Sequence, residues 1–286
     1  MNLIYPKVEN WTPRDQISHV ARCARVCYAS ETDNESSNFR LYKSLESKGH
    51  TSMFRHESRY YCILKSDVGE KTYNKIYNEL LKYKYCPYIY YLVDNGIIYV
   101  ATNGDFARNK TYKNLMQQLN YFEVEGEVLE TNEIAKKGIR HTFCITTQIS
   151  TSRELNRTSP NNIAEQSTRY VNFGKKGGIT ICVPHWWDDA SWFKKFIHKT
   201  YWKGCEIMYN LCLKIGMKPE DARGVLPLDT ATRVVYTYNT FEWENIIKLR
   251  YIGSTGKPHP NAKAVIAQVA CQLKTMGYSN FNFYGI

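Results

Sequence analysis

The sequence contains no long apolar run, no internal repeat and no low-complexity tract. A membrane-spanning helix needs roughly 20 consecutive, mainly apolar residues, and no window of this chain approaches that composition. The first residues, from Met1 to Pro6, also lack the apolar core of a signal peptide. These absences exclude membrane-spanning and repeat proteins, and we expect the protein to lie in the cytoplasm.

Cysteine is present, but not in the spacing of a metal site. There are nine cysteines, an odd number, and we interpret them as reduced thiols of a cytosolic protein. Cys23 and Cys27 are four residues apart and could share a helix face, yet no second Cys/His pair follows at zinc spacing. We therefore expect no bound metal, and small buried side chains instead.

The composition is that of a folded protein with a basic surface. The chain has 286 residues, of which 43% are hydrophobic and 23 are Tyr, enough for a sizeable core. We expect a single domain over residues 1–286, with an elaboration at about 67–136. The net charge of +11 suits either nucleic acid or small phosphorylated ligands, and charge alone does not choose between them.

Capping and turn signals predict the elements. Thr12, Pro13 and Asp15 resemble a helix start, Gly49 is a helix stop, and Asp94-Asn95-Gly96 indicates a hairpin. Helices are expected over about 12–30, 37–48, 73–83, 106–122, 188–215, 219–236, 240–250 and 260–276. Strands are expected over 58–64, 88–93, 97–101, 141–147 and 179–184. Because strands and helices mix without regular βαβ alternation, we predict the α+β class.

The segment from Ser152 to Phe173 combines arginines with carboxylates and hydroxyls. It contains Arg153, Glu154, Arg157, Glu165, Ser167, Arg169 and Tyr170. The planar fork of arginine suits phosphate. Ser167 and Arg169 would point the same way in an extended segment and could clamp a phosphate together. A salt-bridged surface segment would have the same composition, so both interpretations stay open on these residues alone.

The spacing within this segment resembles that of flavin-dependent thymidylate synthases. These enzymes carry an R-H-R triplet, seven or eight residues, and then S-x-R-Y. This chain has Arg157-Thr158-Ser159, seven further residues, and then Ser167-Thr168-Arg169-Tyr170. Upstream, SRELNR at 152–157 resembles S-H-E-L-V-R, and downstream RYVNF at 169–173 resembles R-Y-C-N-Y.

Further motifs lie in the order found in the same family. GHTSMFRH at 49–56 resembles G-H-x-S-x-x-E-H, the stretch from Ala21 to Ser30 resembles A-R-x-C-Y-x-S, and ARGVLPL at 222–228 resembles A-R-x-V-L-P. The resemblance covers roughly 12–65 and 138–275. It implies an α+β fold with a mixed sheet flanked by long helices, and a homotetramer whose site is built from several subunits.

The resemblance also implies roles for individual residues. Arg250 would be catalytic, stabilising charge that develops on a pyrimidine ring. The residues assigned to the nucleotide are Glu154, Arg157, Glu165, Ser167, Arg169, Arg223 and Arg250. The residues assigned to FAD are His50, Ser52, Arg157, Thr158, Ser159, Asn239 and Asn245. The implied reaction moves a one-carbon unit from methylenetetrahydrofolate to C5 of dUMP to give dTMP, with FAD and NADPH.

The chain departs from the family pattern mainly on the flavin side. Thr158 and Ser159 replace the His and second Arg of R-H-R, Arg55 replaces the Glu of E-H, and Phe241 stands where members commonly have Arg. The substrate is therefore expected to be a pyrimidine nucleotide rather than nucleic acid, while the outcome can differ. The alternatives are 5-hydroxymethylation, UMP or dCMP as substrate, or a catalytically silent nucleotide-binding or nucleic-acid-binding protein.

Overall fold

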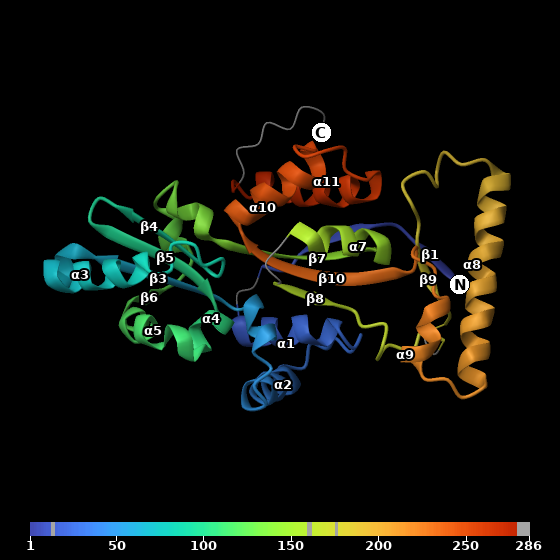
Figure 1. The fold of residues 1–286 in the computed structure, drawn as a ribbon, viewed down its shortest axis with the longest axis horizontal. Coiled ribbons are helices and arrows are strands. Elements are labelled where there is room, and N and C mark those ends of the chain that lie inside the picture. The colour runs from blue at the N-terminus through green and yellow to red at the C-terminus, as the bar shows by residue number, and fades with distance from the viewer. Residues whose placement is uncertain (13–14, 159–161, 175–176, 279–286) are drawn as a thin grey trace.

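The computed structural model describes residues 1–12, 15–158, 162–174 and 177–278, which form an elongated molecule built around three sheets (Figure 1). The strands are β1 (Asn2–Ile4), β2 (Lys7–Asn10), β3 (Ser58–Leu64), β4 (Ile89–Asp94), β5 (Ile97–Asn103), β6 (Glu123–Val124), β7 (Arg140–Gln148), β8 (Ile163–Glu165), β9 (Thr180–Cys182) and β10 (Ala231–Asn239). The helices are α1 (Gln16–Val26), α2 (Glu35–Ser47), α3 (Lys65–Leu81), α4 (Gly104–Arg108), α5 (Lys113–Leu119), α6 (Glu127–Glu130), α7 (Ile149–Leu155), α8 (Trp192–Lys214), α9 (Pro219–Ala222), α10 (Thr240–Ile247) and α11 (Pro260–Thr275). The predicted α+β class is confirmed.

The central sheet has the order β2-β7-β10-β8 and is antiparallel throughout. Helices α7, α10 and α11 cover one face and α1 covers the other (Figure 1). Side chains alternate between these faces with the period of two that a strand dictates. Thus Phe143 and Val234 join the cluster under α10 and α11, whereas Cys144 and Val235 pack toward α1.

A second antiparallel sheet, β4-β5-β3-β6, forms a lobe at one end of the molecule (Figure 1). Helices α3 and α5 close its own hydrophobic core, to which Tyr61, Ile76 and Leu115 contribute. The predicted hairpin is confirmed, since Asn95 and Gly96 both have the positive φ of a type I′ turn. Because β3 belongs to this lobe, the lobe begins before residue 67. That the chain forms a single domain stays a prediction.

At the other end, β1 and β9 pair in parallel beneath the long helix α8 (Figure 1). Trp187, Trp202 and Tyr209 fill the space between the helix and these strands. None of the helices in the described parts of the chain is long and apolar enough to cross a membrane. All nine cysteines are free thiols.

Several predicted elements are wrong or displaced. The predicted helix over 219–236 consists of the single turn α9, a short 3-10 turn and most of strand β10. Helix α1 begins at Gln16 because Asp15, rather than Thr12, caps it by accepting from the amides of Ile17 and Ser18. Pro13 lies outside the described residues. The predicted helix over 106–122 is broken into α4, α5 and two 3-10 turns.

Candidate nucleotide and cofactor site

A cavity of about 800 Å³ lies where the turn after β8 meets α7 and the segment that follows α9. We call it the arginine cavity. It is lined by Ile149, Arg153, Glu165, Gln166, Ser167, Thr168, Arg169, Arg223, Gly224, Leu226, Pro227 and Leu228. Three arginines face one glutamate in this lining, so the cavity carries an excess of positive charge that suits an anionic ligand. The structure thus brings four of the predicted nucleotide residues together: Glu165, Ser167, Arg169 and Arg223.

Strand pairing positions Glu165, the last residue of β8, opposite Val234 of β10. Its carboxylate accepts hydrogen bonds from the hydroxyls of Ser152 (2.6 Å) and Thr232 (3.1 Å). Asn156 donates a third bond, at 3.2 Å. These three donors fix the carboxylate at the edge of the cavity, so it can accept from a ligand without moving.

Arg169 and Arg223 are held less firmly than Glu165. The guanidinium of Arg169 lies 3.2 Å from the carboxylate of Glu220, and that of Arg223 donates to the Thr168 hydroxyl at 3.2 Å. The expectation that the segment around Ser167 is extended is wrong. A turn follows β8, and the Ser167 hydroxyl accepts a hydrogen bond from the Arg169 amide. Both side chains line the cavity nevertheless. Exposed contacts of this kind are weak, so a phosphate can displace them.

A second cavity, of about 560 Å³, lies between the lobe and α10. We call it the aromatic cavity. It is lined by Cys86, Pro87, Ile89, Tyr90, Thr158, Tyr238, Asn239, Phe241, Glu242, Asn245, Ile246 and Lys248. Three of the predicted cofactor residues, Thr158, Asn239 and Asn245, therefore share one cavity.

Asn239 has a structural function there as well. It is the N-cap of α10, and its side-chain oxygen accepts from the Glu242 amide at 2.8 Å, while the Glu242 carboxylate accepts from the Asn239 amide at 2.9 Å. This reciprocal capping box stabilises the start of the helix. Burial raises the pKa of Glu242, an effect that the charge of Arg140 opposes.

The remaining predicted cofactor residues do not line either cavity of one chain. His50 and Ser52 are exposed at the short 3-10 helix Thr51–His56, and Arg157 is exposed in the turn after α7. Ser159 lies outside the described residues.

The lining of the aromatic cavity fits one part of a flavin better than the rest. Its mainly apolar side chains, including Tyr90, Tyr238 and Phe241, suit a planar ring system. Lys248 is the only cation among the described lining residues, so a diphosphate finds little compensation there. The residues of one chain therefore fit the ring of a flavin. Within the described parts of the chain, no group of His, Cys, Asp and Glu could hold a metal ion.

Sequence reasoning missed part of both cavities. Thr168, which holds Arg223, was passed over as the variable position of the S-x-R-Y motif. Cys86, Pro87 and Tyr90 come from the lobe and carry no local signal, because only the tertiary fold brings them against α10.

Comparison with known proteins bears on the C-terminal half of the chain. Residues 137–276 match the family model of the thymidylate synthase complementing protein. No curated protein matches the sequence. Two solved structures similar to this one are those of the UMP/dUMP methylase PolB from Streptomyces cacaoi, bound with 5-Br dUMP or with 5-Br UMP. Both have a TM-score of 0.44 and 16% identity and cover 96% of this chain; the match spans 93% of the first and 91% of the second. The family match includes the arginine cavity and α10, but neither His50 nor the lobe.

Proposed function

We propose that the chain, whose residues 137–276 match the model of the thymidylate synthase complementing protein family, is a divergent member of that family. It would be an enzyme of methyltransferase type that transfers a one-carbon unit to C5 of a pyrimidine nucleotide. The proposed substrate is dUMP and the proposed product dTMP. The observation that supports this proposal most is the arginine cavity, which Arg153, Arg169 and Arg223 line together with the anchored carboxylate of Glu165. A nucleotide phosphate matches this excess of positive charge.

The residues of the chain would bind and orient the nucleotide. Arg169 and Arg223 would hold its phosphate. Glu165 would accept hydrogen bonds from the uncharged part of the nucleotide rather than contact the phosphate. Arg250, whose side chain is mostly buried, would stabilise negative charge on the pyrimidine ring as C5 becomes nucleophilic. The C5 proton leaves when the new carbon bond has formed.

We propose FAD as the cofactor, with its ring in the aromatic cavity beside Thr158, Asn239 and Asn245. In this chemistry, methylenetetrahydrofolate supplies the carbon, and reduced flavin, regenerated by NADPH, supplies the hydride that completes the methyl group. The apolar walls of the cavity would exclude water from the ring.

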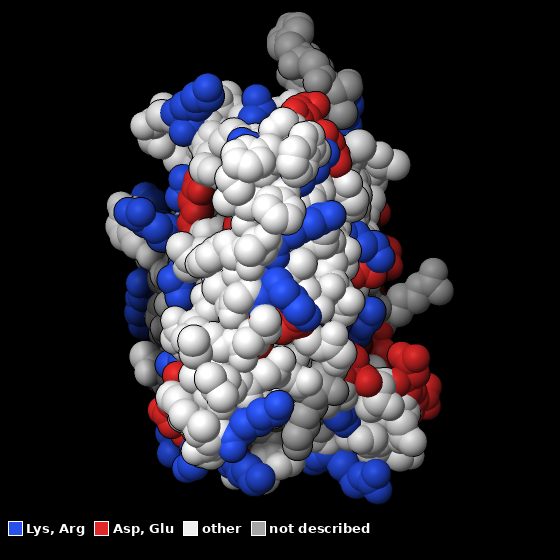
Figure 2. All heavy atoms as spheres, turned by 90° about the vertical axis from the view of Figure 1, so that its right-hand side faces the viewer, with Lys and Arg blue, Asp and Glu red and all other residues white. Residues whose placement is uncertain are grey.

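We further propose that the protein assembles as a homotetramer. The exposed side of α8 and its C-cap carries large hydrophobic residues: Trp192, Phe193, Phe196, Ile197, Tyr201, Ile207, Met208, Leu211 and Ile215. Figure 2 shows the end of the molecule where this helix lies, a surface with wide uncharged areas between scattered lysines and arginines. Contiguous apolar surface of this kind usually marks an interface. A second chain could also supply His50, Ser52 and Arg157 to the cofactor.

Two measurements test this function. The purified protein should show the absorption bands of flavin, or acquire them when FAD is added. It should also convert dUMP in the presence of methylenetetrahydrofolate and NADPH, and mass spectrometry of the product would distinguish a methyl from a hydroxymethyl group. UMP and dCMP, tested alongside, cover the alternative substrates. A colourless protein that takes up no FAD at high micromolar concentration would favour the catalytically silent nucleotide-binding or nucleic-acid-binding alternative.

A further inference from the structure

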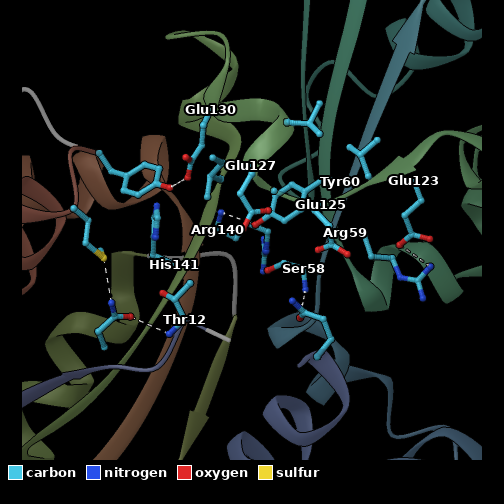
Figure 3. A pocket seen from close by; sticks show the side chains of 18 residues that line it. Thr12, Ser58, Arg59, Tyr60, Glu123, Glu125, Glu127, Glu130, Arg140 and His141 are labelled. Carbon is cyan, nitrogen blue, oxygen red and sulfur yellow. Dashed lines mark hydrogen bonds and ion pairs between the residues drawn. The ribbon is translucent and has the colours of Figure 1, made fainter. Parts of the chain in front are cut away.

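A third cavity, of about 1330 Å³, lies between the lobe and the end of α11 and shares no lining residue with the two cavities above. We call it the glutamate cavity. The segment from β6 through α6 contributes Glu123, Glu125, Glu127 and Glu130 to it, and β7 contributes Arg140 and His141. Figure 3 shows these side chains around the opening. Tyr278, which follows α11, lines the same cavity.

The acidic side of the cavity is only partly neutralised. Glu123 lies 3.5 Å from the guanidinium of Arg59, and Glu130 accepts a hydrogen bond from the Tyr278 hydroxyl. Among the described residues, neither Glu125 nor Glu127 has an ion-pair partner or a side-chain hydrogen bond. Two uncompensated carboxylates in a chain of net charge +11 create a local site for positive charge.

His141 provides a second and independent indication of a ligand. Its side chain is 2% exposed, yet neither ring nitrogen has a hydrogen-bond partner among the described residues. The ring lies in the cavity wall (Figure 3) and packs against Tyr278, with ring centroids 4.2 Å apart. Buried polar groups are almost always satisfied by protein, water or ligand, so this ring calls for a partner from the cavity.

The imidazole is neutral at physiological pH, because burial lowers the pKa of His141 to about 3. One ring nitrogen is then a donor and the other an acceptor. The backbone of His141 is fixed by its pairing opposite Tyr238 in the ladder of β7 and β10, and by Trp243, whose indole donates to the His141 carbonyl at 3.1 Å. An acceptor nitrogen held in this way can receive a ligand N–H.

We propose that the glutamate cavity binds a small organic cation that carries several N–H groups, of the polyamine class. One ammonium group is held by Glu125 and Glu127, and a second N–H donates to the free nitrogen of His141. The rings of Tyr60 and Tyr278 line the same space, and the Lys136 ammonium lies 5.2 Å from the centroid of the Tyr278 ring. A bare metal ion fits less well, because the described residues offer no ligand group for one.

This site is separate from the proposed enzyme function. None of its residues lines the arginine cavity or the aromatic cavity. Binding can therefore be measured on the protein without nucleotide or flavin, and it would stand if the proposed reaction were refuted.

Isothermal titration calorimetry with spermidine tests the proposal. The wild-type protein should bind spermidine saturably, and the double variant Glu125→Gln/Glu127→Gln should weaken binding at least tenfold. Glu133→Gln removes an exposed carboxylate of the same lobe outside the cavity and should leave the affinity unchanged. His141→Asn, checked for folding by circular dichroism, should also weaken binding.

Three results would overturn the proposal. The first is the absence of saturable binding up to millimolar spermidine. The second is equal weakening by Glu133→Gln, which would indicate diffuse attraction to an acidic surface. The third is that the amino acid glutamate, an anion at neutral pH, binds with the same affinity as spermidine. The Glu125→Gln/Glu127→Gln variant changes only exposed side chains, so the test remains decisive even if His141→Asn fails to fold.

Discussion

The guanidinium of Arg250 lies 3.5 Å from the carboxylate of Glu154, so the residue proposed to act on the pyrimidine ring is paired with one proposed to bind the nucleotide. Arg250 belongs to the π-helical turn Lys248–Ile252 that extends α10, and Glu154 to α7. The Nε atom of Arg250 is buried and has no hydrogen-bond partner among the described residues. Glu154 therefore holds the guanidinium of Arg250 in place.

Replacing Arg250 by alanine should lower turnover more than nucleotide affinity. Its contact strengthens as charge grows on the ring, and such interactions act mainly in the transition state. Loss of a donor of this kind typically lowers kcat by roughly 10²–10³-fold. Steady-state kinetics and calorimetric titration of dUMP on the same variant separate the two effects. Equal losses of kcat/KM and affinity, with kcat unchanged, would instead make Arg250 a simple binding residue.

Replacing an arginine of the arginine cavity should instead lower nucleotide affinity more than turnover. Arg169→Ala or Arg223→Ala removes a charge-assisted hydrogen bond to phosphate, which corresponds to about 1.5–3 kcal/mol, roughly a tenfold to hundredfold loss of nucleotide affinity. Arg40→Ala, in the exposed face of α2, is the matched control and should bind as wild type. Unchanged affinities for dUMP, UMP and dCMP in both cavity variants would refute the phosphate site.

A charge placed on α8 should disrupt the proposed assembly. Wild-type protein should give a mass in solution of four times the 33.4-kDa chain by light scattering. Phe196→Glu with Ile207→Glu should shift it to smaller species, because a carboxylate is costly to bury in an apolar interface. Tyr121→Glu, at a side chain 86% exposed in the lobe, controls for the added charge. A wild-type monomer at micromolar concentration would contradict the homotetramer.

The sequence predicts an element well where apolar residues lie on one face of the element and polar residues on the other. It also does so where a turn requires particular residues. Strand β3 and the β4–β5 hairpin are examples, since Asn95-Gly96 fits only a few turns. Strand β10 was mistaken for a helix because both of its faces are buried. Val234 and Val235 are each fully buried, so no alternation of apolar and polar residues remains to reveal a period of two.

The same reasoning explains what could be predicted of the site. Ser167, Arg169 and Arg223 were identified through ordered motifs, and they line one cavity although 223 is more than fifty positions from 169. Pro87 and Tyr90 could not be identified, because their place against α10 depends on how the lobe packs on the central sheet. The assignment of individual roles to these residues remains a prediction.

Buried histidines should make the fold sensitive to acid. Burial, reinforced by the charge of Arg22, lowers the pKa of His19 to about 3, and burial lowers the pKa of His56 well below its ordinary value. The unfolded chain binds these protons near pH 6.5, so stability is fully present above that pH and falls as the pH drops toward 3. Each histidine contributes a slope of up to about 1.4 kcal/mol per pH unit.

Urea unfolding at a series of pH values between 7 and 5 measures this slope. His19→Asn should flatten it by about one proton, whereas His50→Asn, at an exposed position, should leave it unchanged. A free energy of unfolding that does not change over this range would mean that the buried imidazoles are protonated in the folded state.

Restoring the family triplet tests whether the aromatic cavity has been remodelled. Thr158 donates to the Leu155 carbonyl at 2.6 Å and lines this cavity together with Phe241 and Tyr90. We expect Thr158→His with Ser159→Arg to lower the native activity, because the larger side chain at position 158 intrudes on a space already bounded by aromatic rings. Overpacking typically costs about 1–3 kcal/mol, which is roughly a fivefold to hundredfold loss of flavin affinity or turnover. Flavin titration and product analysis measure both, with Thr131→His at an exposed position as the control. If activity instead stays the same or rises, the cavity still accepts the family's cations, and the chain is an ordinary thymidylate synthase whose triplet has drifted.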